Sequence, residues 1–390
     1  MNSKINHIKN IHLIQYFIQK TWIRFATKIK KYLNFKSVDV YIIGAYHGFN
    51  AGDISMGVSI KKNANKLGIN TQLISLDQIS EIRNGEANKY ILGGGAIFSP
   101  KNLNNLIKKT ENNLSNVAIL GVDLHLNHSE ENLNYLKNSA FMTSRFHPKK
   151  EVKYDFHQKL LRDDIVWHPD LTFAFYPLPD QKKKEINKKI IGLNIFPFFY
   201  RRAKKQWVFD CYADKIPYNP STKLSEHQQI IIAQQYVNLM RRIVQTHLDE
   251  GFSVYHLPFA LEDDLFAKFC LSNLPVKFLS FSNKPHQIFN RMQLFEKFIP
   301  TRLHAHIFAA IAKVPFLSIS YGTKCRKLLE HLQVPQECSI DYTSLLDSDF
   351  VNQDFSALNK KEFVCRDEDL LNFSTESQLV INETLKRLMK

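Results

Sequence analysis

The feature that most constrains the fold is a regular alternation of short apolar segments with longer amphipathic ones. The amphipathic segments predict helices, the clearest over 224–251 and 323–332. Strands that alternate with helices form parallel βαβ units, with helices on both faces of a sheet. The class is therefore α/β, with two Rossmann-like doubly wound domains. The predicted strands are 38–43, 71–76, 89–98, 116–124, 140–147 and 164–175 in the first half, and 190–199, 252–259, 276–281 and 315–320 in the second.

A break rich in proline and lysine, "PLPDQKKKEINKK", separates the two series of strands. We therefore expect an N-terminal domain over 37–178 and a C-terminal domain over 188–340. Residues 341–390 are expected to form a tail, with helical signal over 367–389. The chain has 390 residues, of which 44% are hydrophobic, and this is enough for two cores.

A basic arm precedes the first domain at residues 1–36. Positions 1–38 hold eight lysine and arginine residues and no Asp or Glu, about half of the formal net charge of +15. Apolar residues, Trp22 among them, recur there at roughly helical spacing. Such a helix could lie on an anionic membrane surface, with its lysines on lipid headgroups. The alternative is a helix that packs on the folded body, and the sequence leaves both open.

The overall charge predicts an anionic partner, because a strongly basic chain attracts phosphorylated metabolites, nucleic acids or acidic membranes. No stripe of basic residues with interleaved aromatics is present, so we expect no nucleic-acid partner. The five cysteines include no CxxC pair and indicate reduced thiols. No apolar run approaches the length of a membrane span, and no secretory signal is present. We expect a cytoplasmic protein, peripheral at the inner face of the plasma membrane if the arm binds lipid.

The stretch "FIPTRLHAHIFAAIAKVPFLSISYGTK" (298–324) contains the best site candidates. A helix is predicted over 303–312 with Thr301 as its cap, which places Arg302 and His304 in the first turn. Unsatisfied N–H groups and the dipole favour an anion there. Arginine can bind a carboxylate or phosphate with two parallel hydrogen bonds, and histidine can transfer a proton near neutral pH. The alternative is a surface turn with incidental charges, and His306 is expected to be structural.

Other candidates follow predicted strands, since ligands of open parallel sheets bind beyond the carboxyl ends of the strands. Asp53 is either a helix cap or a cleft residue that orients a hydroxyl or acts as a base. The triplet Gly93, Gly94 and Gly95 either lets backbone N–H groups approach a ligand or allows tight packing. No metal site is expected, because no carboxylate or cysteine completes a set with the histidines.

Further cations follow strands of the second half. Lys324, after Tyr321, is either a cationic contact or a solvated lysine. Arg201 or Arg202 could be a second clamp on a multiply charged anion, which needs at least two cations in a dry cleft.

These segments, in this order, resemble the polysaccharide pyruvyl transferase family. The resemblance spans about 40–325, and its most specific part is the block from the R-L-H-A helix start to the S-Y-x-x-K strand. The matching residues are Asn50, Gly52 and Asp53; Gly93 to Gly95; Ser144 and Arg145; Pro169, Asp170 and Phe173; Arg302, Leu303, His304 and Ala305; and Pro315, Ile319, Ser320, Tyr321 and Lys324.

The resemblance implies a GT-B-like fold with phosphoenolpyruvate as donor. It implies as acceptor a sugar of a cell-surface polysaccharide, such as an exopolysaccharide or capsule, or of its lipid-linked precursor. Arg302 and His304 match the donor-binding and catalytic positions, whereas Asn50, Asp53 and the glycines would lie on the acceptor side. No cofactor is implied, because phosphoenolpyruvate is a co-substrate. The alternatives are a nucleotide-sugar glycosyltransferase of the same architecture and an inactive scaffold held at the membrane.

Overall fold

The described residues of the computed structural model form two compact units. The N-terminal unit combines residues up to 177 with residues 368–390, and the C-terminal unit contains 178–367. Each unit is considered by itself. The predicted basic arm lies outside the described residues except for Thr21. The described residues are 21, 38–46, 50–82, 89–95, 100–110, 114–122, 130–145, 158, 160, 162–178, 189–197, 199–203, 206–209, 224–352 and 360–390.

The N-terminal unit is built on a six-stranded parallel sheet with the strand order β2-β1-β3-β4-β5-β6. Apolar β-branched residues fill its central strands, as expected of a parallel sheet buried on both faces. The strands are β1 (Val40–Gly44), β2 (Thr71–Ser75), β3 (Lys89–Gly95), β4 (Val117–Val122), β5 (Phe141–Arg145) and β6 (Val166–His168).

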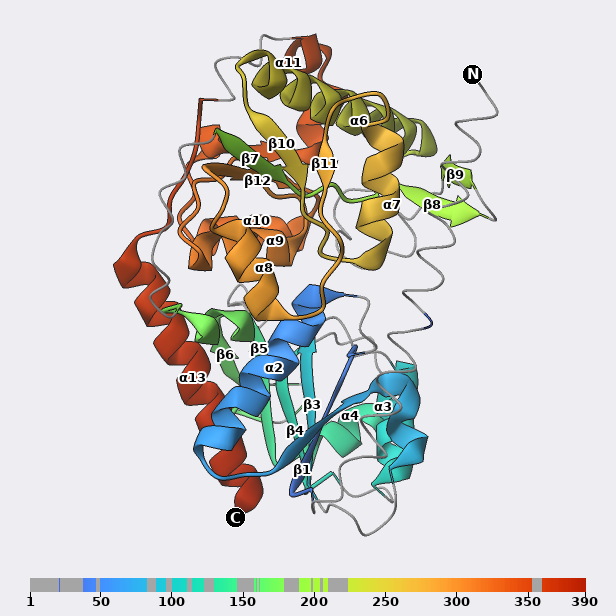
Figure 1. The fold of residues 1–390 in the computed structure, drawn as a ribbon. Helices are drawn as coiled ribbons and strands as arrows, with labels where there is room; N and C mark the ends of the chain where they lie inside the picture. The colour runs from blue at the N-terminus through green and yellow to red at the C-terminus, as the bar shows by residue number, and fades with distance from the viewer. Residues whose placement is uncertain are drawn as a thin grey trace. The chain divides into compact units, whose positions relative to one another are not determined.

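Helices cover both faces of this sheet (Figure 1). On one face, α2 (Ala51–Lys66) and α13 (Asp367–Met389) share a core with Val40 and Ile42 of β1. On the other face, α3 (Pro100–Lys109) and α4 (Glu130–Lys137) pack with alternate residues of the same strands. The doubly wound prediction is therefore confirmed for this unit. The helix predicted near the end of the chain is α13, and it completes a face of the first sheet.

The C-terminal unit contains a four-stranded parallel sheet with the order β11-β10-β7-β12. One face packs on α6 and α7, and the other carries Phe298, which stacks on Phe295 at 5.7 Å between ring centroids. The strands and helices are β7 (Ile190–Leu193), α6 (Glu226–Asp249), β10 (Ser253–His256), α7 (Leu261–Cys270), β11 (Lys277–Phe278), α8 (Pro285–Met292), β12 (Lys297–Ile299), α9 (Leu303–Ile311) and α10 (Thr323–His331).

Smaller elements complete the described chain. Strands β8 (Tyr200–Ala203) and β9 (Gln206–Phe209) form an antiparallel hairpin, and β13 (Ser318–Ser320) pairs in parallel with β14 (Ser339–Asp341). No described helix is long and apolar enough to cross a bilayer. The remaining short helices are η1 (Leu76–Glu81), η2 (Leu171–Phe175), η4 (Gln336–Cys338), η5 (Tyr342–Leu346) and α11 (Ser348–Asn352).

Several predicted strands are shorter than expected. The segment 164–175 pairs only at β6 and then turns into the 3₁₀ helix η2, because the Asp170 side chain accepts a hydrogen bond from the Thr172 N–H and caps this helix. The segment 190–199 leaves the sheet after Leu193. Strand β12 was not predicted, since its three residues are too few to show a periodicity.

Candidate functional site

The carboxyl edge of the C-terminal sheet brings together three polar residues from three strand ends. Asn194 directly follows β7, Asp263 lies in the first turn of α7 after β10, and Arg302 follows β12. The Asn194 side chain accepts the Arg302 N–H at 3.0 Å through Oδ1 and donates to Asp263 Oδ2 at 3.2 Å through Nδ2. A hydrogen-bonded network therefore ties the three strand ends together at the edge where ligands of parallel sheets bind.

The Arg302 guanidinium is held by two carboxylates of the same unit. Nε donates to Asp263 Oδ1 and Oδ2, each at 2.8 Å, and Nη2 lies 2.7 Å from Asp263 Oδ1. Nη2 also donates to Glu262 Oε1 at 2.9 Å. Nη1 has no protein partner within the described part of the chain. Asp263 thus binds the edge of the guanidinium formed by Nε and Nη2. On the edge formed by Nη1 and Nη2, only Nη2 is bound.

Asp263 is a fully buried carboxylate with a complete set of donors. Besides Arg302 and Asn194, the backbone N–H groups of Phe259 and Ala260 donate to its Oδ2 at 3.0 and 2.9 Å. A buried charge is tolerated only when it is paired and hydrogen-bonded in this way. Asp263 therefore fixes the start of α7 and the Arg302 side chain at once.

Aromatic rings line the same edge. The Arg302 guanidinium lies over the Phe196 ring at 4.6 Å, and Phe196 packs on Tyr321 with 4.8 Å between centroids. Burial would lower the pKa of Arg302, but the Asp263 and Glu262 carboxylates outweigh it and raise that pKa above the ordinary arginine value. Arg302 is therefore a permanent, pre-oriented cation, and Tyr321 belongs to its surroundings.

The start of α9 differs from the prediction in its cap. Arg302 is the N-cap residue, with no side-chain cap bond, and the helix begins at Leu303. Thr301 is not the cap, because its hydroxyl instead lies 3.0 Å from the hydroxyl of Tyr236, a buried residue of α6. The first-turn amides of α9 are left without a side-chain cap, and the carbonyl of Arg302 accepts the His306 N–H.

His304 and His306 occupy different environments on α9. His304 lies in the first turn and is buried. His306 is fully buried, its Nδ1 donates to the Arg302 carbonyl at 2.8 Å, and its Nε2 lies 2.8 Å from the Ser318 hydroxyl. Burial lowers the pKa of His306 to about 4, so the ring is neutral near pH 7. His306 thus joins α9 to β13, as expected of a structural residue.

The remaining C-terminal candidates lie in α10 and in the β8–β9 hairpin. Lys324 is in the first turn of α10 and partly exposed, three residues after Tyr321. Arg201 and Arg202 are in the β8–β9 hairpin, where their backbone pairs with Val208 and Trp207. Their placement as a second clamp stays a prediction.

In the N-terminal unit, Asn50 immediately precedes α2, the first described helix after β1, and Asp53 lies in its first turn. The Asn50 side chain accepts the Gly52 N–H at 3.0 Å, so Asn50, rather than Asp53, is the cap. Asp53 lies in the first turn, and its Oδ1 is 2.9 Å from the point that a Cβ on Gly95 would occupy. The carboxylate and the end of the glycine triplet are therefore neighbours.

The glycine triplet ends β3 where α2 approaches closely. A Cβ on Gly93 would lie 2.9 Å from Ile60 Cδ1, and one on Gly94 would lie 2.8 Å from Met56 Cβ. Gly94 and Gly95 also have positive φ values of 77° and 87°. Helix packing and backbone conformation explain these glycines without a ligand.

A buried ion pair joins two motifs that the sequence placed in the resemblance. Arg145 Nη1, at the end of β5, donates to Asp170 Oδ2 at 2.7 Å, and both side chains are almost fully buried. Next to it, His168 Nε2 lies 2.9 Å from the Thr143 hydroxyl. The S-R and P-D motifs therefore meet in space at the carboxyl edge of the first sheet.

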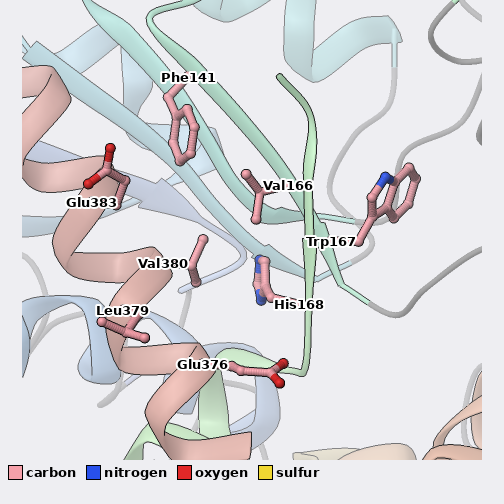
Figure 2. Close-up of a pocket in the computed structure, with 8 residues that line it drawn as sticks. All are labelled: Phe141, Val166, Trp167, His168, Glu376, Leu379, Val380 and Glu383. Carbon is pink, nitrogen blue, oxygen red and sulfur yellow. The ribbon is translucent and has the colours of Figure 1, made fainter. Parts of the chain in front are cut away.

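A separate groove lies between α13 and the edge strand β6. Figure 2 shows Leu379 and Val380 of α13 facing Val166 and His168, with Glu376 and Glu383 to either side. Its volume is about 540 Å³. None of the residues predicted from the sequence lines this groove.

The sequence did not reveal the partners of Arg302. Asn194 ends an apolar strand, and Glu262 and Asp263 follow another, so polar residues at two strand ends were the available signal. The residues that the structure describes contain no group of three or more His, Cys, Asp or Glu side chains that could hold a metal ion.

The comparison with protein families finds a match over part of the chain. Residues 151–323 match the polysaccharide pyruvyl transferase family. The resemblance stated from the motifs is confirmed over this segment. The matched segment contains the P-D-x-x-F motif and the R-L-H-A start of α9, so Arg302 and His304 lie inside it. The N-x-G-D turn and the glycine triplet lie before it. No curated protein matches the chain.

Three solved structures illustrate the similarity in the course of the chain. A UDP-GlcNAc 2-epimerase from Methanocaldococcus jannaschii is 13% identical, with 81% of this chain and 93% of that chain covered and a TM-score of 0.41. An α-glucosyltransferase solved with UDP and DNA is 11% identical, with 90% and 100% covered and a TM-score of 0.44. An α,α-trehalose-phosphate synthase from Burkholderia xenovorans is 10% identical, with 95% and 78% covered and a TM-score of 0.37.

Proposed function

We propose that the chain transfers the pyruvyl group of phosphoenolpyruvate to a sugar of a cell-surface polysaccharide or of its lipid-linked precursor. Two sugar hydroxyls would be bridged as a pyruvate ketal, with release of phosphate. The single observation that carries the proposal is the start of α9 within the family-matched segment, where a pre-oriented guanidinium stands beside uncapped helix amides.

The chemistry of the donor fits this arrangement. Phosphoenolpyruvate carries a carboxylate and a phosphate, and a site that removes it from water must offer cations and N–H donors. Arg302 Nη1 and the first-turn amides of α9 would meet one anionic group. Lys324, or an arginine of the β8–β9 hairpin, would meet the other.

The reaction would proceed through proton transfer to the terminal CH₂ of phosphoenolpyruvate. C2 then becomes an oxocarbenium-like centre, a sugar hydroxyl forms the first C–O bond there, and the C2–O bond to phosphate breaks. A second hydroxyl closes the ketal. Of the two hydroxyl protons, one balances the new methyl group and one leaves with phosphate. We assign the acid to His304, which lies in the first turn of α9 beside Arg302. The scheme needs no cofactor.

The direct test is release of inorganic phosphate from phosphoenolpyruvate in the presence of a panel of lipid-linked and nitrophenyl sugars. We expect release that depends on one class of acceptor and a product heavier by the pyruvate ketal. Hydrolysis of UDP- or GDP-sugars with the same acceptors, and no use of phosphoenolpyruvate, would overturn the proposal in favour of a glycosyltransferase.

A further inference from the structure

The two carboxylates on Arg302 differ in how firmly they are held. Asp263 has a side chain with 0% exposure and is bound by four residues besides its own helix contacts. The Glu262 side chain is 54% exposed, and within the described residues its one polar partner is Arg302 Nη2 at 2.9 Å. Breaking a buried pair leaves an uncompensated charge in the interior, whereas an exposed pair contributes little to stability. Only Glu262 can therefore leave Arg302 at small cost.

The geometry of the guanidinium connects this difference between the two carboxylates to the binding of a ligand anion. A guanidinium offers two edges for bidentate binding of a carboxylate or phosphate, one through Nε and Nη2 and one through Nη1 and Nη2. Asp263 takes the first edge. Glu262 contacts the second edge at Nη2 alone and leaves Nη1 open. A ligand anion could use the second edge fully only after Glu262 moves away.

We propose that Glu262 is a placeholder carboxylate that a substrate anion displaces from Arg302, whereas Asp263 and Asn194 are positioning residues that keep the guanidinium in place. The assignment of that anion to phosphoenolpyruvate rests on the proposed function. Glu262 keeps the cation paired while the site is empty. Its displacement subtracts from the affinity for the anion and favours ligands that offer two oxygens to one edge.

Two Glu262 variants test the displacement by their affinity for the anion. Glu262→Gln removes the competing charge, and Glu262→Asp keeps the charge but shortens the side chain by one CH₂ and loses the contact. Both should tighten binding by about 1.4- to 5-fold, the factor that corresponds to an exposed ion pair. If only Glu262→Gln tightens binding, long-range charge explains the effect and the displacement proposal is wrong.

The positioning residues require a different readout. Asp263→Asn keeps the shape of the side chain but removes the charge that orients Nε and Nη2. We expect a KM for the donor that rises more than 10-fold, with a smaller change in kcat, because Arg302 then samples other rotamers. Equal loss of kcat and no change of KM would contradict a positioning role. Circular dichroism would exclude variants that fail to fold.

The experiment is isothermal titration of the full-length protein with phosphoenolpyruvate, inorganic phosphate and UDP as separate probes. The matched control is Glu337→Gln, an exposed glutamate of η4 in the same unit, which should leave each Kd unchanged. Tightening of UDP binding alone would support the placeholder and refute phosphoenolpyruvate as donor. Turnover of phosphoenolpyruvate with an unchanged Kd in both Glu262 variants would support the donor and refute the placeholder. Failure of all three probes to bind the wild-type protein would also refute it.

Discussion

Acid should destabilise the C-terminal unit through two buried histidines. Burial lowers the pKa of His306 and of His256 to about 4 in the folded protein, against about 6.5 in an unfolded chain. Both are fully buried, at the start of α9 and the end of β10. Between pH 6.5 and 4 the unfolded state therefore binds more protons than the folded state. The stabilisation is complete above pH 6.5 and is lost as the pH falls towards 4.

The magnitude follows from the size of the shift. A difference of about 2.5 pKa units corresponds to roughly 3 kcal/mol for each histidine, at about 1.4 kcal/mol per pH unit while each one titrates. The variant His306→Gln loses hydrogen bonds to the Arg302 carbonyl and Ser318, so it should be less stable at pH 7. Because glutamine does not titrate, the stability of the variant should fall less steeply with acid. The wild-type and variant curves should therefore converge by about 3 kcal/mol between pH 7 and pH 4.

The assay is urea unfolding of the full-length protein at half-unit pH steps. A reporter in the C-terminal unit, such as hydrogen exchange of the α9 amides, would assign the transition. The matched control is His227→Gln, at an exposed position of α6 in the same unit. Parallel curves for the wild-type protein and His306→Gln would show that His306 is not buried in neutral form.

Three further outcomes follow from the site and the fold. His304→Ala should lower kcat by about 10²- to 10⁴-fold with an unchanged circular dichroism spectrum, and near-normal turnover would remove His304 from the proton transfer. Arg302→Lys should raise the KM for phosphoenolpyruvate, because an ammonium cannot replace the fork between Asp263 and an anion, and an unchanged KM would contradict a donor contact. Leu385→Ala, at a fully buried position of α13, should cost about 2–5 kcal/mol in urea unfolding of the N-terminal unit, and a cost below 1 kcal/mol would show that α13 does not complete that core.

Long periodic segments were predictable because their signal is local. The helices over 224–251 and 367–389 were expected from apolar spacing, and they are α6 and α13 with nearly the same ends. The segment 164–175 has an apolar strand pattern, but the Asp170 cap bond to the Thr172 N–H outweighs it and starts η2. Apolar patterns in the sequence therefore predict the layers of the fold, but not its short strands and turns.

The candidate site could be predicted only in part. Arg302 and His304 stand out in sequence because cations are unfavourable at a helix start and so draw attention to it. We expected an anionic ligand to balance the positive charge at this helix start. Asp263, 39 residues earlier in the chain, supplies much of the negative charge instead. No local pattern reports such a pairing, because it depends on the neighbouring positions of β7, β10 and β12 in the sheet. The Glu262 contact was missed for the same reason.

The most direct test of the proposed donor site at Arg302 is a crystal structure of the full-length protein soaked with phosphoenolpyruvate. We predict two donor oxygens within hydrogen-bond distance of Arg302 Nη1 and Nη2, an anionic group at the first-turn amides of α9, and Glu262 turned away from the guanidinium. Density for the donor far from Arg302, or an Arg302–Glu262 contact that persists with the donor bound, would contradict it.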